Sequence, residues 1–475
     1  MSELIDADVC VIGAGSAGLS VAAGAAQMGA RTVLIEGHRM GGDCLNTGCV
    51  PSKSLLAAAK AAYASRNAHR FGIELDEPRI DFAATNRYVH SVIATIAPHD
   101  SVERFTALGC RVIQARGRFI DRRTVVAGDV TVRARRFVIA SGSRPFIPPI
   151  EGLGSVPFFT NETIFDNAVL PDHLIVIGAG PIGCEMAQAH RRLGAKVTVL
   201  DLARMLPKDD PEAVEVVRQR FRAEGIEMGE MVKIRRVEKR DSALAVVLTD
   251  GKQERYIEGT HLLVATGRAA NVGNLGLEAA GVRYSPKGIE VDARLRTSNK
   301  RIFAAGDVIG GYQFTHVASY HAGIVLRNAL FRLPAKRSSK ALPWVTYTDP
   351  ELAQVGLSEM DARKIHGDTI RVVRAEFDEN DRAQTEGSPL GFLKAVVTKR
   401  GRILGATIVG PHAGELILPW VLAISKGHKI GDIAGLIAPY PPLSEISKRA
   451  AGSFFTPLLF SARTRWLVRF LGAFG

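Results

Sequence analysis

"ADVCVIGAGSAGLSVAAGAAQMGARTVLIE", residues 7–36, and "HLIVIGAGPIGCEMAQAHRRLGAKVTVLD", residues 173–201, are two copies of one pattern. Each predicts an apolar strand, a glycine-rich turn, a helix of small residues and a second strand that ends in an acidic residue. The acidic residue follows the first glycine at the same distance in both copies. Glycines alone mark only a tight turn, but this full context predicts two Rossmann-type βαβ units.

The conserved geometry of such units assigns a role to each glycine and each acid. The glycines permit the tight turn, the close approach of a pyrophosphate and the packing of helix on strand, while the acid accepts hydrogen bonds from a ribose. These roles fall on Gly13, Gly15, Gly18 and Glu36 in the first copy, and on Gly178, Gly180, Gly183 and Asp201 in the second. The sequence therefore predicts two bound dinucleotides.

Composition sets the limits for other functions. The chain has 475 residues, of which 46% are hydrophobic and 23% charged, and carries a formal net charge of +13. A chain of this length buries a large core and divides into about two to four domains. The basic residues are scattered and no nucleic-acid-binding module is recognised, so we expect a solvated basic surface and no nucleic-acid partner.

The five cysteines indicate a reducing compartment. Their number is odd and they are spread along the chain, unlike the disulfide framework of a small secreted protein. The first residues lack the basic region of a signal peptide, and no apolar stretch reaches the length of a membrane span. We therefore expect a cytoplasmic protein. Cys10, Cys110 and Cys184 lie in apolar or helix-like settings and are expected to be buried.

The remaining two cysteines lie in "GDCLNTGCVPSK", residues 42–53. In one regular helix, Cα atoms five residues apart lie about 8.6 Å from each other, beyond the limit of about 7 Å for a disulfide. A bond between Cys44 and Cys49 therefore needs a bent chain, for which Gly48 supplies the freedom. Pro51 fixes its own φ and disfavours helical backbone at Val50, so we expect a helix that starts at Pro51. Cys49 would then precede a helix N-terminus, which favours a thiolate. Disulfide, metal clip and chance spacing remain open from the spacing alone.

The order of motifs divides the chain into parts. Strand-then-glycine segments at residues 135–150 and 261–272 are expected to return to the first and second βαβ sheets, respectively, and the texture changes after residue 345 to a mixed α+β pattern. We assign residues 1–150 and 273–345 to a first dinucleotide-binding domain, 151–272 to a second one inserted into it, and 346–475 to a separate domain. The predicted class is α/β with an added α+β domain.

Taken together, these motifs resemble the FAD-dependent pyridine nucleotide–disulfide oxidoreductases, in the branch of mercuric reductase and dihydrolipoamide dehydrogenase. The resemblance rests on "GAGSAG", "GGDCLNTGCVPSK", "ASGSRP", "GAGPIG", "ATGR", "AAGD" and "YPPLSE", which occur in this order over essentially the whole chain. It implies an oxidoreductase with FAD in the first domain, a nicotinamide dinucleotide in the second, and a C-terminal dimerisation domain that makes a homodimer.

The resemblance also implies roles for individual residues. Cys44 resembles the thiol that meets the substrate and Cys49 the thiol that faces the flavin, so the pair is expected to be a redox-active disulfide charged by a nicotinamide through FAD. Zinc is not expected, because the sequence has a single close cysteine pair. The remaining positions that match cofactor contacts of the family are Lys53, Ser141, Gly142, Glu185, Gly267, Asp307 and Thr315.

Asp201 decides the expected nicotinamide. A carboxylate suits the free 2′-hydroxyl of NADH and repels the 2′-phosphate of NADPH. We therefore expect NADH, and keep NADPH as the alternative because Arg204 and Lys208 follow closely.

The segment "YPPLSE", residues 440–445, departs from the pattern of the family. Relatives place a histidine and a glutamate here as an acid–base pair that serves the partner's site, whereas this chain has Tyr440 and Glu445. A phenol with a pKa near 10 does not readily accept a proton from a thiol at pH 7, so we expect poor dihydrolipoamide oxidation. Mercuric reductases share the tyrosine. This chain has no cysteine after Cys184 that could pass mercury to the sulfur pair, so we expect weak mercury turnover.

We therefore expect a homodimeric FAD enzyme that oxidises NADH and reduces a disulfide, soft-metal or reactive-sulfur acceptor through Cys44 and Cys49. The alternatives are a dihydrolipoamide dehydrogenase, a diaphorase that reduces quinone or oxygen, and a membrane-docked flavoprotein that bypasses the cysteines. In "SARTRWLVRFLGAFG", residues 461–475, the arginines and aromatic residues have the spacing of a basic amphipathic helix. We expect this helix to pack on the protein, and peripheral membrane contact is the less favoured interpretation.

Overall fold

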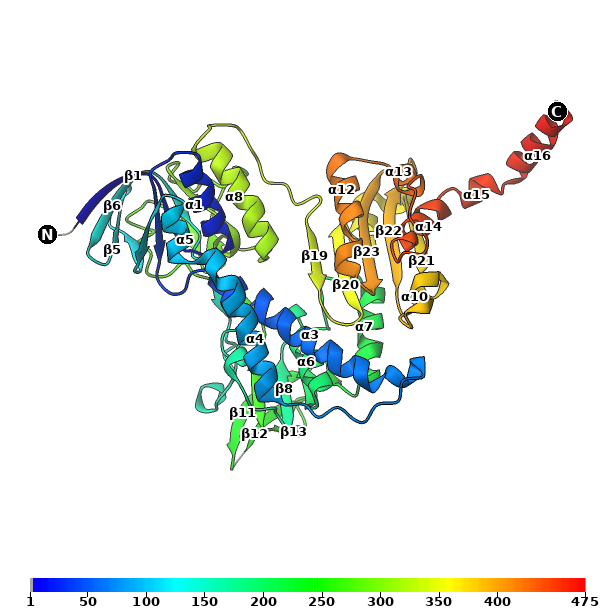
Figure 1. Ribbon diagram of the computed structural model, residues 1–475, viewed down its shortest axis with the longest axis horizontal. Helices are drawn as coiled ribbons and strands as arrows, with labels where there is room; N and C mark the ends of the chain where they lie inside the picture. The colour runs from blue at the N-terminus through cyan, green and yellow to red at the C-terminus, as the bar shows by residue number, and fades with distance from the viewer. Residues whose placement is uncertain (1–2, 242, 475) are drawn as a thin grey trace. The chain divides into compact units, whose positions relative to one another are not determined.

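The computed structural model describes residues 3–241 and 243–474, which divide into two compact units (Figure 1). The first unit comprises the chain up to His69, Glu74–Leu202 and Gly229–Ser338. The second comprises Arg70–Ile73, Ala203–Met228 and the chain from Ser339. The first unit carries both glycine motifs and both clustered cysteines, so each unit is described on its own.

A parallel sheet forms the centre of the first unit. Strand β1 pairs in parallel with β2 on one side and β6 on the other, β2 continues to β3, and β18 also pairs in parallel with β6. An antiparallel meander of β4 and β5 extends from β6. The strands are β1 (Glu3–Ile12), β2 (Thr32–Glu36), β3 (Cys110–Gln114), β4 (Gly117–Phe119), β5 (Thr124–Ala127), β6 (Val130–Ile139) and β18 (Ile302–Ala304). Residues 135–139 thus return to the first sheet as expected, whereas residues 143–145 of the same segment pair in another ladder.

A second parallel sheet repeats the pattern in the same unit. β8 (His173–Ile177) pairs in parallel with β9 (Lys196–Leu200) and with β14 (His261–Val264), as expected of the second βαβ unit. A neighbouring antiparallel sheet is formed by β11 (Lys233–Arg240), β12 (Ala243–Thr249) and β13 (Glu254–Gly259). Short ladders join β7 (Ser143–Pro145) to β15 (Arg268–Ala270) and β16 (Tyr284–Ser285) to β17 (Gly288–Ile289).

Helices of small residues follow both glycine turns. α1 (Ser16–Gln27) buries Ala17, Ala22 and Ala25, which lets it lie close to the strands, and it packs against α8 (Thr315–Ala329). α6 (Pro181–Leu193) packs against α3 (Cys49–Arg66), and α3 packs against α4 (Phe82–Ile96). The short helices α2 (Gly42–Asn46) and α5 (Val102–Ala107) complete the helices of this unit. The contact of α3 with α6 connects the cysteine segment to the second glycine motif.

One local prediction was wrong: α3 begins at Cys49, with Gly48 as its N-cap, and not at Pro51. Pro51 stands in the first turn, where a missing N–H and the ring of proline are tolerated, so it does not displace the helix start. Val50, the residue before Pro51, is part of the helix, so the usual preference for extended backbone before a proline does not hold here. Cys49 therefore stands at the first helical position, still at the positive end of the helix dipole.

The second unit is built on an antiparallel sheet in the order β19-β20-β23-β22-β21. Its strands are β19 (Pro343–Thr346), β20 (Glu351–Gly356), β21 (Ile370–Glu376), β22 (Phe392–Thr398) and β23 (Ile403–Gly410). α7 (Pro211–Ala223) packs against β20 and β23. The buried Lys394 of β22 makes ion pairs with Asp210 at 2.7 Å and Glu212 at 2.8 Å, which hold the start of α7 on the sheet.

Further helices surround this sheet and extend from it. They are α9 (Glu359–His366), α10 (Asp381–Thr385), α11 (Ala413–Leu416), α12 (Leu418–Lys426), α13 (Ile430–Ala434), α14 (Glu445–Ser453), α15 (Thr456–Leu459) and α16 (Ala462–Leu471). Trp420 of α12 is fully buried and donates a hydrogen bond to Ser447 of α14 at 3.1 Å. α15 and α16 lead outward from α14 (Figure 1), and both consist of residues that are not buried. The expectation that the last helix packs on the protein is wrong for this chain.

Candidate functional site

The first glycine turn has the form of a phosphate-binding loop. Gly13 has φ +103°, and a Cβ there would lie 2.3 Å from the carbonyl oxygen of Ala140. A Cβ at Gly18 would lie 1.8 Å from the carbonyl oxygen of Gly13, so helix and turn touch through glycine backbone. At Gly15, the N-cap of α1, a Cβ would approach Gly42 only to 3.8 Å. The loop therefore leaves room at the helix N-terminus, where free N–H groups bind phosphate.

The acidic residue after each second strand binds the same loop position in both copies. Glu36 accepts hydrogen bonds from the backbone N–H of Ala14 and of His38, each at 2.6 Å. Asp201 accepts one from the N–H of Ala179, also at 2.6 Å. A carboxylate has about four acceptor positions, so both side chains keep capacity for ribose hydroxyls.

The second glycine turn repeats the first. Gly178 has φ +114°, and a Cβ there would lie 2.4 Å from the carbonyl oxygen of Ala265. A Cβ at Gly183 would lie 1.9 Å from the carbonyl oxygen of Gly178, whereas one at Gly180 would meet no atom of the described residues within 4 Å. The N-terminal end of α6 is therefore as open to a pyrophosphate as that of α1.

Cys44 and Cys49 lie on two consecutive helices that are separated by a break at Gly48. Cys44 belongs to α2 and Cys49 to α3, and Gly48 between them has φ −131° and ψ −111°. A Cβ at Gly48 would lie 2.9 Å from the carbonyl oxygen of Asp43, so only glycine fits this bend without a shift. All five cysteines are described and are free thiols, and the side chains of Cys44 and Cys49 are hydrogen-bonded to each other.

The two sulfurs differ strongly in acidity. The hydrogen bond from Cys44 lowers the pKa of Cys49 to about 6, and the hydroxyl of Thr315 and the ammonium of Lys53 act in the same direction, against burial and the Glu185 carboxylate. The hydrogen bond to Cys49, together with burial, raises the pKa of Cys44. At neutral pH the pair is therefore a Cys49 thiolate and a protonated Cys44. The S–H of Cys44 donates a hydrogen bond to that thiolate.

The side chains around Cys49 come from distant parts of the chain. Thr315, the first residue of α8, has its Oγ1 3.4 Å from the Cys49 Sγ. Lys53 is one turn along α3 from Cys49, and its Nζ lies 2.7 Å from a carboxylate oxygen of Glu185 on α6. Glu185 is buried, with a side chain 7% exposed, so the ion pair satisfies its charge. The structure thus contains the lysine–glutamate pair that the family resemblance implied.

A polar network joins the remaining expected residues of this unit. Ser141 donates to the backbone carbonyl of Asn271 at 2.8 Å, and the carbonyl of Gly142 accepts from the N–H of Asn271 at 3.0 Å. Gly267, with φ +133°, accepts from the N–H of Phe146 at 2.9 Å. These contacts bring the ends of β6 and β14 together, beside the β7–β15 ladder.

Arg268 is a residue of this site that the sequence analysis missed. Its Nε donates to Ser143 at 2.7 Å and lies 3.7 Å from the Asp307 carboxylate, while its terminal nitrogen donates to Asp43, the neighbour of Cys44. Ser143 in turn donates to Asp307 at 2.6 Å. Burial raises the pKa of Asp307, against the opposing effects of Ser143 and Arg268. The sequence did offer a signal for Arg268, because Asp43 and Arg268 both lie inside the motifs that carry the family resemblance.

Tyr440 and Glu445 belong to the second unit. The Tyr440 hydroxyl donates to the Asp381 carboxylate of α10 at 2.6 Å, and this hydrogen bond raises the pKa of the phenol. Glu445 is the first residue of α14. Tyr440 is 72% exposed. Asp381 had no signal in the sequence, because nothing in its surroundings distinguishes it from other surface carboxylates.

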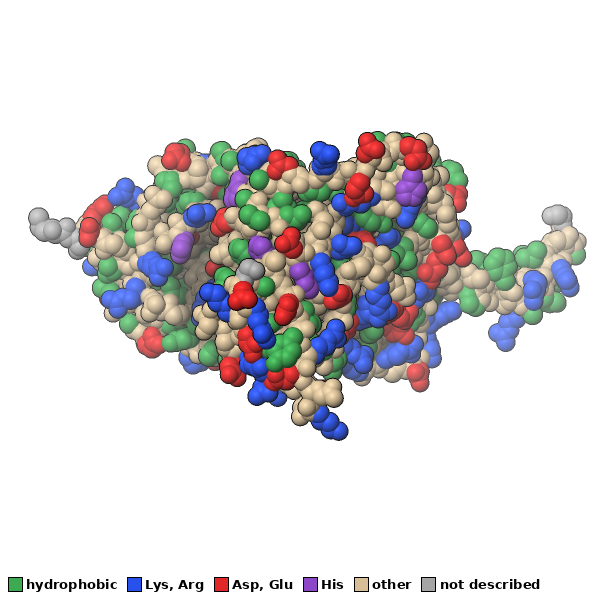
Figure 2. All heavy atoms as spheres, turned by 90° about the horizontal axis from the view of Figure 1, so that it is seen from below, with side chains coloured by type: hydrophobic (Ala, Val, Ile, Leu, Met, Phe, Trp, Pro, Cys, Tyr) green, Lys and Arg blue, Asp and Glu red, His purple; other side chains and the backbone are tan. Residues whose placement is uncertain are grey.

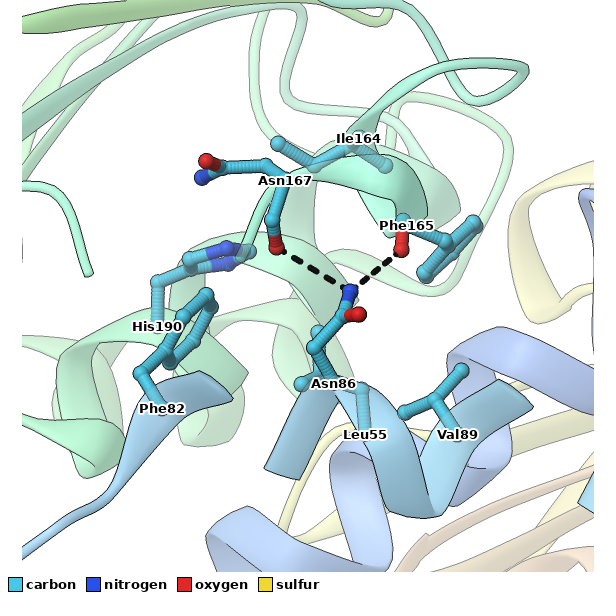
Figure 3. Close-up of a pocket in the computed structure, with 8 residues that line it drawn as sticks. All are labelled: Leu55, Phe82, Asn86, Val89, Ile164, Phe165, Asn167 and His190. Atoms are coloured by element: carbon cyan, nitrogen blue, oxygen red, sulfur yellow. Dashed lines mark hydrogen bonds between the residues drawn. The ribbon is translucent and has the colours of Figure 1, made fainter. Parts of the chain in front are cut away.

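A small cavity of the first unit lies among α3, α4 and α6 (Figure 3). It is lined by Leu55, Phe82, Asn86, Val89, Ile164, Phe165, Asn167 and His190. Its volume of about 10 Å³ corresponds to roughly one water molecule. Asn86 donates to the carbonyls of Phe165 and Asn167 at 2.6 and 3.1 Å.

His190 in this cavity is neutral, because burial lowers its pKa to about 4. Its Nδ1 donates to the carbonyl of Met186 at 2.8 Å, and its Nε2 has no partner among the described residues. A lone acceptor in a space for one water is an ordinary interior feature. The lining contains neither clustered cysteine, so the cavity supports the helices of the site and is not part of it.

The residues present fit two dinucleotides. Both glycine loops end at open helix N-termini, and each has a carboxylate placed to receive a ribose. The same unit contains the thiolate of Cys49, with Thr315 and the Lys53–Glu185 pair near it. Such an arrangement can accept, hold and pass on an electron pair.

Comparison with known proteins agrees with this chemistry. Residues 7–322 match the family profile described as pyridine nucleotide-disulphide oxidoreductase, and residues 342–451 match the dimerisation domain of the same family. A mercuric reductase from Streptomyces lividans is 33% identical over 94% of this chain and 96% of its own length. A dihydrolipoyl dehydrogenase from Geobacillus stearothermophilus is 34% identical over 94% and 96%, respectively.

Solved structures are similar over nearly the same length. LpdA from Mycobacterium tuberculosis has a TM-score of 0.87 and 27% identity, covering 94% of this chain and 99% of that one. A Cu(II) complex of RclA, an HOCl-induced flavoprotein disulfide reductase from Escherichia coli, has a TM-score of 0.84 and 26% identity with the same coverage. The predicted class, two dinucleotide-binding domains with a C-terminal dimerisation domain, is confirmed.

Proposed function

Because this chain belongs to the pyridine nucleotide-disulphide oxidoreductase family, we propose that it oxidises NADH and reduces a thiol-reactive acceptor through Cys44 and Cys49. The chain is an enzyme of a family that uses FAD and NAD(P)H. The finer elements of the proposal are the nicotinamide, the sulfur pair and the acceptor class, which is a soft metal ion, a disulfide or a reactive sulfur compound.

The single observation that carries the proposal is the split acidity of the sulfur pair. A hydride brings two electrons and one proton, and their addition to a disulfide yields one thiol and one thiolate. The surroundings of Cys44 raise the pKa of its thiol, while those of Cys49 lower its pKa to about 6. The pair therefore matches the product of hydride addition at neutral pH without a further proton.

Each part of the chain has a defined task in this reaction. The loop at Gly13 and Glu36 holds the pyrophosphate and ribose of FAD, which when bound relays an electron pair from the nicotinamide to the sulfurs. The loop at Gly178 and Asp201 holds the nicotinamide dinucleotide, and the carboxylate of Asp201 favours NADH over NADPH. Lys53, paired with Glu185, adds positive charge beside the Cys49 thiolate.

The acceptor class follows from the chemistry of the reduced pair. A thiol and a thiolate together reduce a thiophilic divalent metal by two electrons, re-form the disulfide and release one proton. Thiolates prefer soft metals and reactive sulfur. The similar proteins named mercuric reductase, and RclA in its complex with Cu(II), support a metal or oxidised sulfur acceptor.

Dihydrolipoamide dehydrogenase activity is the second candidate, supported by the relatives that carry this name. In the oxidative direction this reaction needs a base for a neutral dithiol. The phenol of Tyr440 has a raised pKa because it donates to Asp381, so it is a poor base at pH 7. This favours acceptors that need little proton transfer.

The dimerisation domain at residues 342–451 supports a homodimer. We propose that Tyr440 and Glu445 of one subunit serve the sulfur pair of its partner. This arrangement would leave each site incomplete in a monomer.

Anaerobic titration of the FAD-loaded enzyme with NADH tests the proposal. We expect two electrons to enter before the flavin absorbance is bleached, with a long-wavelength absorbance band and two new titratable thiols per subunit. Cys44→Ser and Cys49→Ser each abolish the gain of thiols, whereas Cys110→Ser, at a buried cysteine of β3, leaves it unchanged. Immediate bleaching of the wild-type flavin with no gain of thiols would contradict the proposal, and a lower KM for NADPH than for NADH would contradict the nicotinamide assignment.

A further inference from the structure

Residues 456–474, here called the C-terminal arm, expose apolar side chains. The arm consists of α15, α16 and the single turn Gly472–Phe474. Its exposed large apolar residues are Leu458, Leu459, Phe460, Trp466, Leu467, Val468, Phe470, Leu471 and Phe474. Trp466 is 65% exposed, although aromatic side chains of this size usually bury most of their surface. A contiguous apolar surface of this kind marks an interaction site.

The arm also carries a one-sided charge. Its charged residues are Arg463, Arg465 and Arg469, and residues 456–474 contain no Lys, Asp or Glu. Figure 2 shows apolar and basic side chains along the arm. The surface is therefore complementary to a partner that is both apolar and anionic.

Apart from Arg463, which shares the side of Trp466 and Phe470, the side chains of α16 separate into faces. Arg465 and Arg469 are one helical turn apart and lie on the same face. Trp466 stacks on Phe470 with ring centroids 5.5 Å apart, and Phe470 meets Phe474 edge-on at 5.0 Å. Leu467 and Leu471, again one turn apart, continue the apolar side. The helix is amphipathic with aromatic residues next to arginines, as in helices that lie at a membrane interface.

The arm is not part of the family's common fold. The profile of the dimerisation domain ends at residue 451, before α15 begins. Residues 456–471, all of them described, contain no buried side chain. Neither the core of the second unit nor the family's common dimerisation domain therefore accounts for the apolar face.

We propose that the C-terminal arm binds the surface of an anionic lipid bilayer and so holds the enzyme at a membrane. The aromatic and leucine side chains enter the boundary between headgroups and acyl chains, and the arginines bind lipid phosphates. α16 has 10 residues and is roughly 15 Å long, about half the thickness of the hydrocarbon core, so it lies along the interface. Among the described residues, the structure has no helix with the length and apolar character needed to cross a bilayer.

Vesicle flotation of the FAD-loaded full-length enzyme tests the proposal. We expect it to float with vesicles of phosphatidylcholine that contain phosphatidylglycerol, and much less with phosphatidylcholine alone. Arg463→Gln, Arg465→Gln and Arg469→Gln combined should lower the partition coefficient by about 100-fold, since each basic residue near an anionic surface contributes about fivefold. Trp466→Ser with Phe470→Ser should weaken binding at high salt as well, because the apolar part is not screened.

A matched control removes the same charge elsewhere in the second unit. Lys399, Arg400 and Arg402 are exposed at the turn between β22 and β23, and their combined change to Gln should leave flotation almost unchanged. Equal loss in both triple variants would contradict the proposal, because net charge alone would then drive binding. Failure of the wild type to float with anionic vesicles also overturns it, and if the arm variants change only the oligomeric state, the arm is an interface between copies of the chain.

Tryptophan fluorescence gives a local readout. Trp420 is fully buried, and Trp344 is partly buried and donates to Asp209 at 2.7 Å, so Trp466 is the tryptophan that responds to lipid. We expect a blue shift on addition of anionic vesicles that is absent in Trp466→Phe, whose flotation remains. A shift that persists in this variant would place the contact elsewhere and overturn the assignment to the arm.

Discussion

At Cys49, the acidity of one sulfur is set by four neighbours that come from four helices. The thiol of Cys44 and the hydroxyl of Thr315 lower its pKa by hydrogen bonding, and the charges of Lys53 and Glu185 act in opposite directions. A thiolate with a pKa of about 6 is formed at neutral pH, and the same group stays accessible because Cys49 is exposed. The residue is therefore tuned by its surroundings and not by its own chemistry alone.

The opposite effects of Lys53 and Glu185 give a prediction with two signs. Lys53→Met removes the favourable charge and should raise the pKa of Cys49 by about one unit, whereas Glu185→Gln removes a repulsive charge and should lower it. The measurement is a pH titration of the long-wavelength band of the two-electron-reduced enzyme. At pH 6 the band should be weaker than wild type in Lys53→Met and stronger in Glu185→Gln.

Cys49→Ser provides the control for this titration, since it should show no such band at any pH. If both charge variants shifted the midpoint in the same direction, the two charges would not act on Cys49 as the structure indicates. Above pH 8 the wild type and both variants should converge, because Cys49 is then ionised in all three.

At the scale of elements, the break between α2 and α3 brings the two cysteines together. In one continuous helix their Cα atoms would be about 8.6 Å apart, whereas the bend at Gly48 lets the two side chains share a hydrogen bond. The contact of α3 with α6 then brings Glu185 to Lys53, and the start of α8 brings Thr315 to Cys49. The geometry of the site is thus a property of helix packing.

Gly48→Ala should disturb this bend. Its Cβ would lie 2.9 Å from the carbonyl oxygen of Asp43, so α2 must move away from α3. We expect a loss of about 1–3 kcal/mol in the free energy of unfolding, as for other overpacked sites, measured by urea denaturation. The pKa of Cys49 should rise towards its ordinary value as the hydrogen bond from Cys44 weakens.

Gly154→Ala is the matched control for this substitution. Gly154 lies in the same unit, and a Cβ there would meet no atom of the described residues within 4 Å. Its stability and the acidity of Cys49 should stay at the wild-type values. A Gly48→Ala variant that behaves like this control would show that the bend is not needed.

At the scale of the whole molecule, residues of the second unit complete the proposed chemistry. The family's dimerisation domain supports a homodimer, in which Tyr440 and Glu445 are proposed to serve the partner's sulfurs. The hydrogen bond from Tyr440 to Asp381 raises the pKa of the phenol, so we expect proton transfer to be the step that limits this chain. The C-terminal arm extends from the same unit, so the proposed membrane binding and the proposed acid–base chemistry belong to one domain.

Tyr440→His should increase dihydrolipoamide oxidation by about 10²- to 10⁴-fold at pH 7–8, because imidazole accepts a thiol proton near neutrality. Steady-state rates with dihydrolipoamide, glutathione disulfide, Hg²⁺ and quinones measure the effect. Reduction of Hg²⁺ should change little, since this acceptor carries no proton that a base must remove.

Tyr440→Phe is the control, because it removes the hydroxyl and keeps the ring. It should match the wild type in dihydrolipoamide oxidation if the phenol transfers no proton. Wild-type turnover of dihydrolipoamide as fast as that of Tyr440→His would show that Tyr440 does not limit the reaction.

The sequence by itself determined the two dinucleotide-binding units. At Gly18 and Gly183 any side chain would collide with the backbone of the same turn, and Gly13 and Gly178 have positive φ, so glycine is a requirement of the local structure at these positions. The acids at Glu36 and Asp201 belong to the same pattern, and the structure adds that both accept a hydrogen bond from the backbone of the glycine turn. Such features depend on short stretches of chain, which is why spacing alone reveals them.

Only the tertiary structure decided the acidity of Cys49, the contacts of Arg268 in the site, the hydrogen-bond partner of Tyr440 and the exposure of the C-terminal arm. Cys49 and Thr315 are far apart in the chain, as are Asp43 and Arg268, and their contacts exist because helices and strands pack in one arrangement. The amphipathic pattern of α16 is compatible with packing on the protein or with a lipid surface. In the folded protein no residue of α16 is buried. Whether α16 packs depends on the surface of the second unit, and that surface forms only on folding.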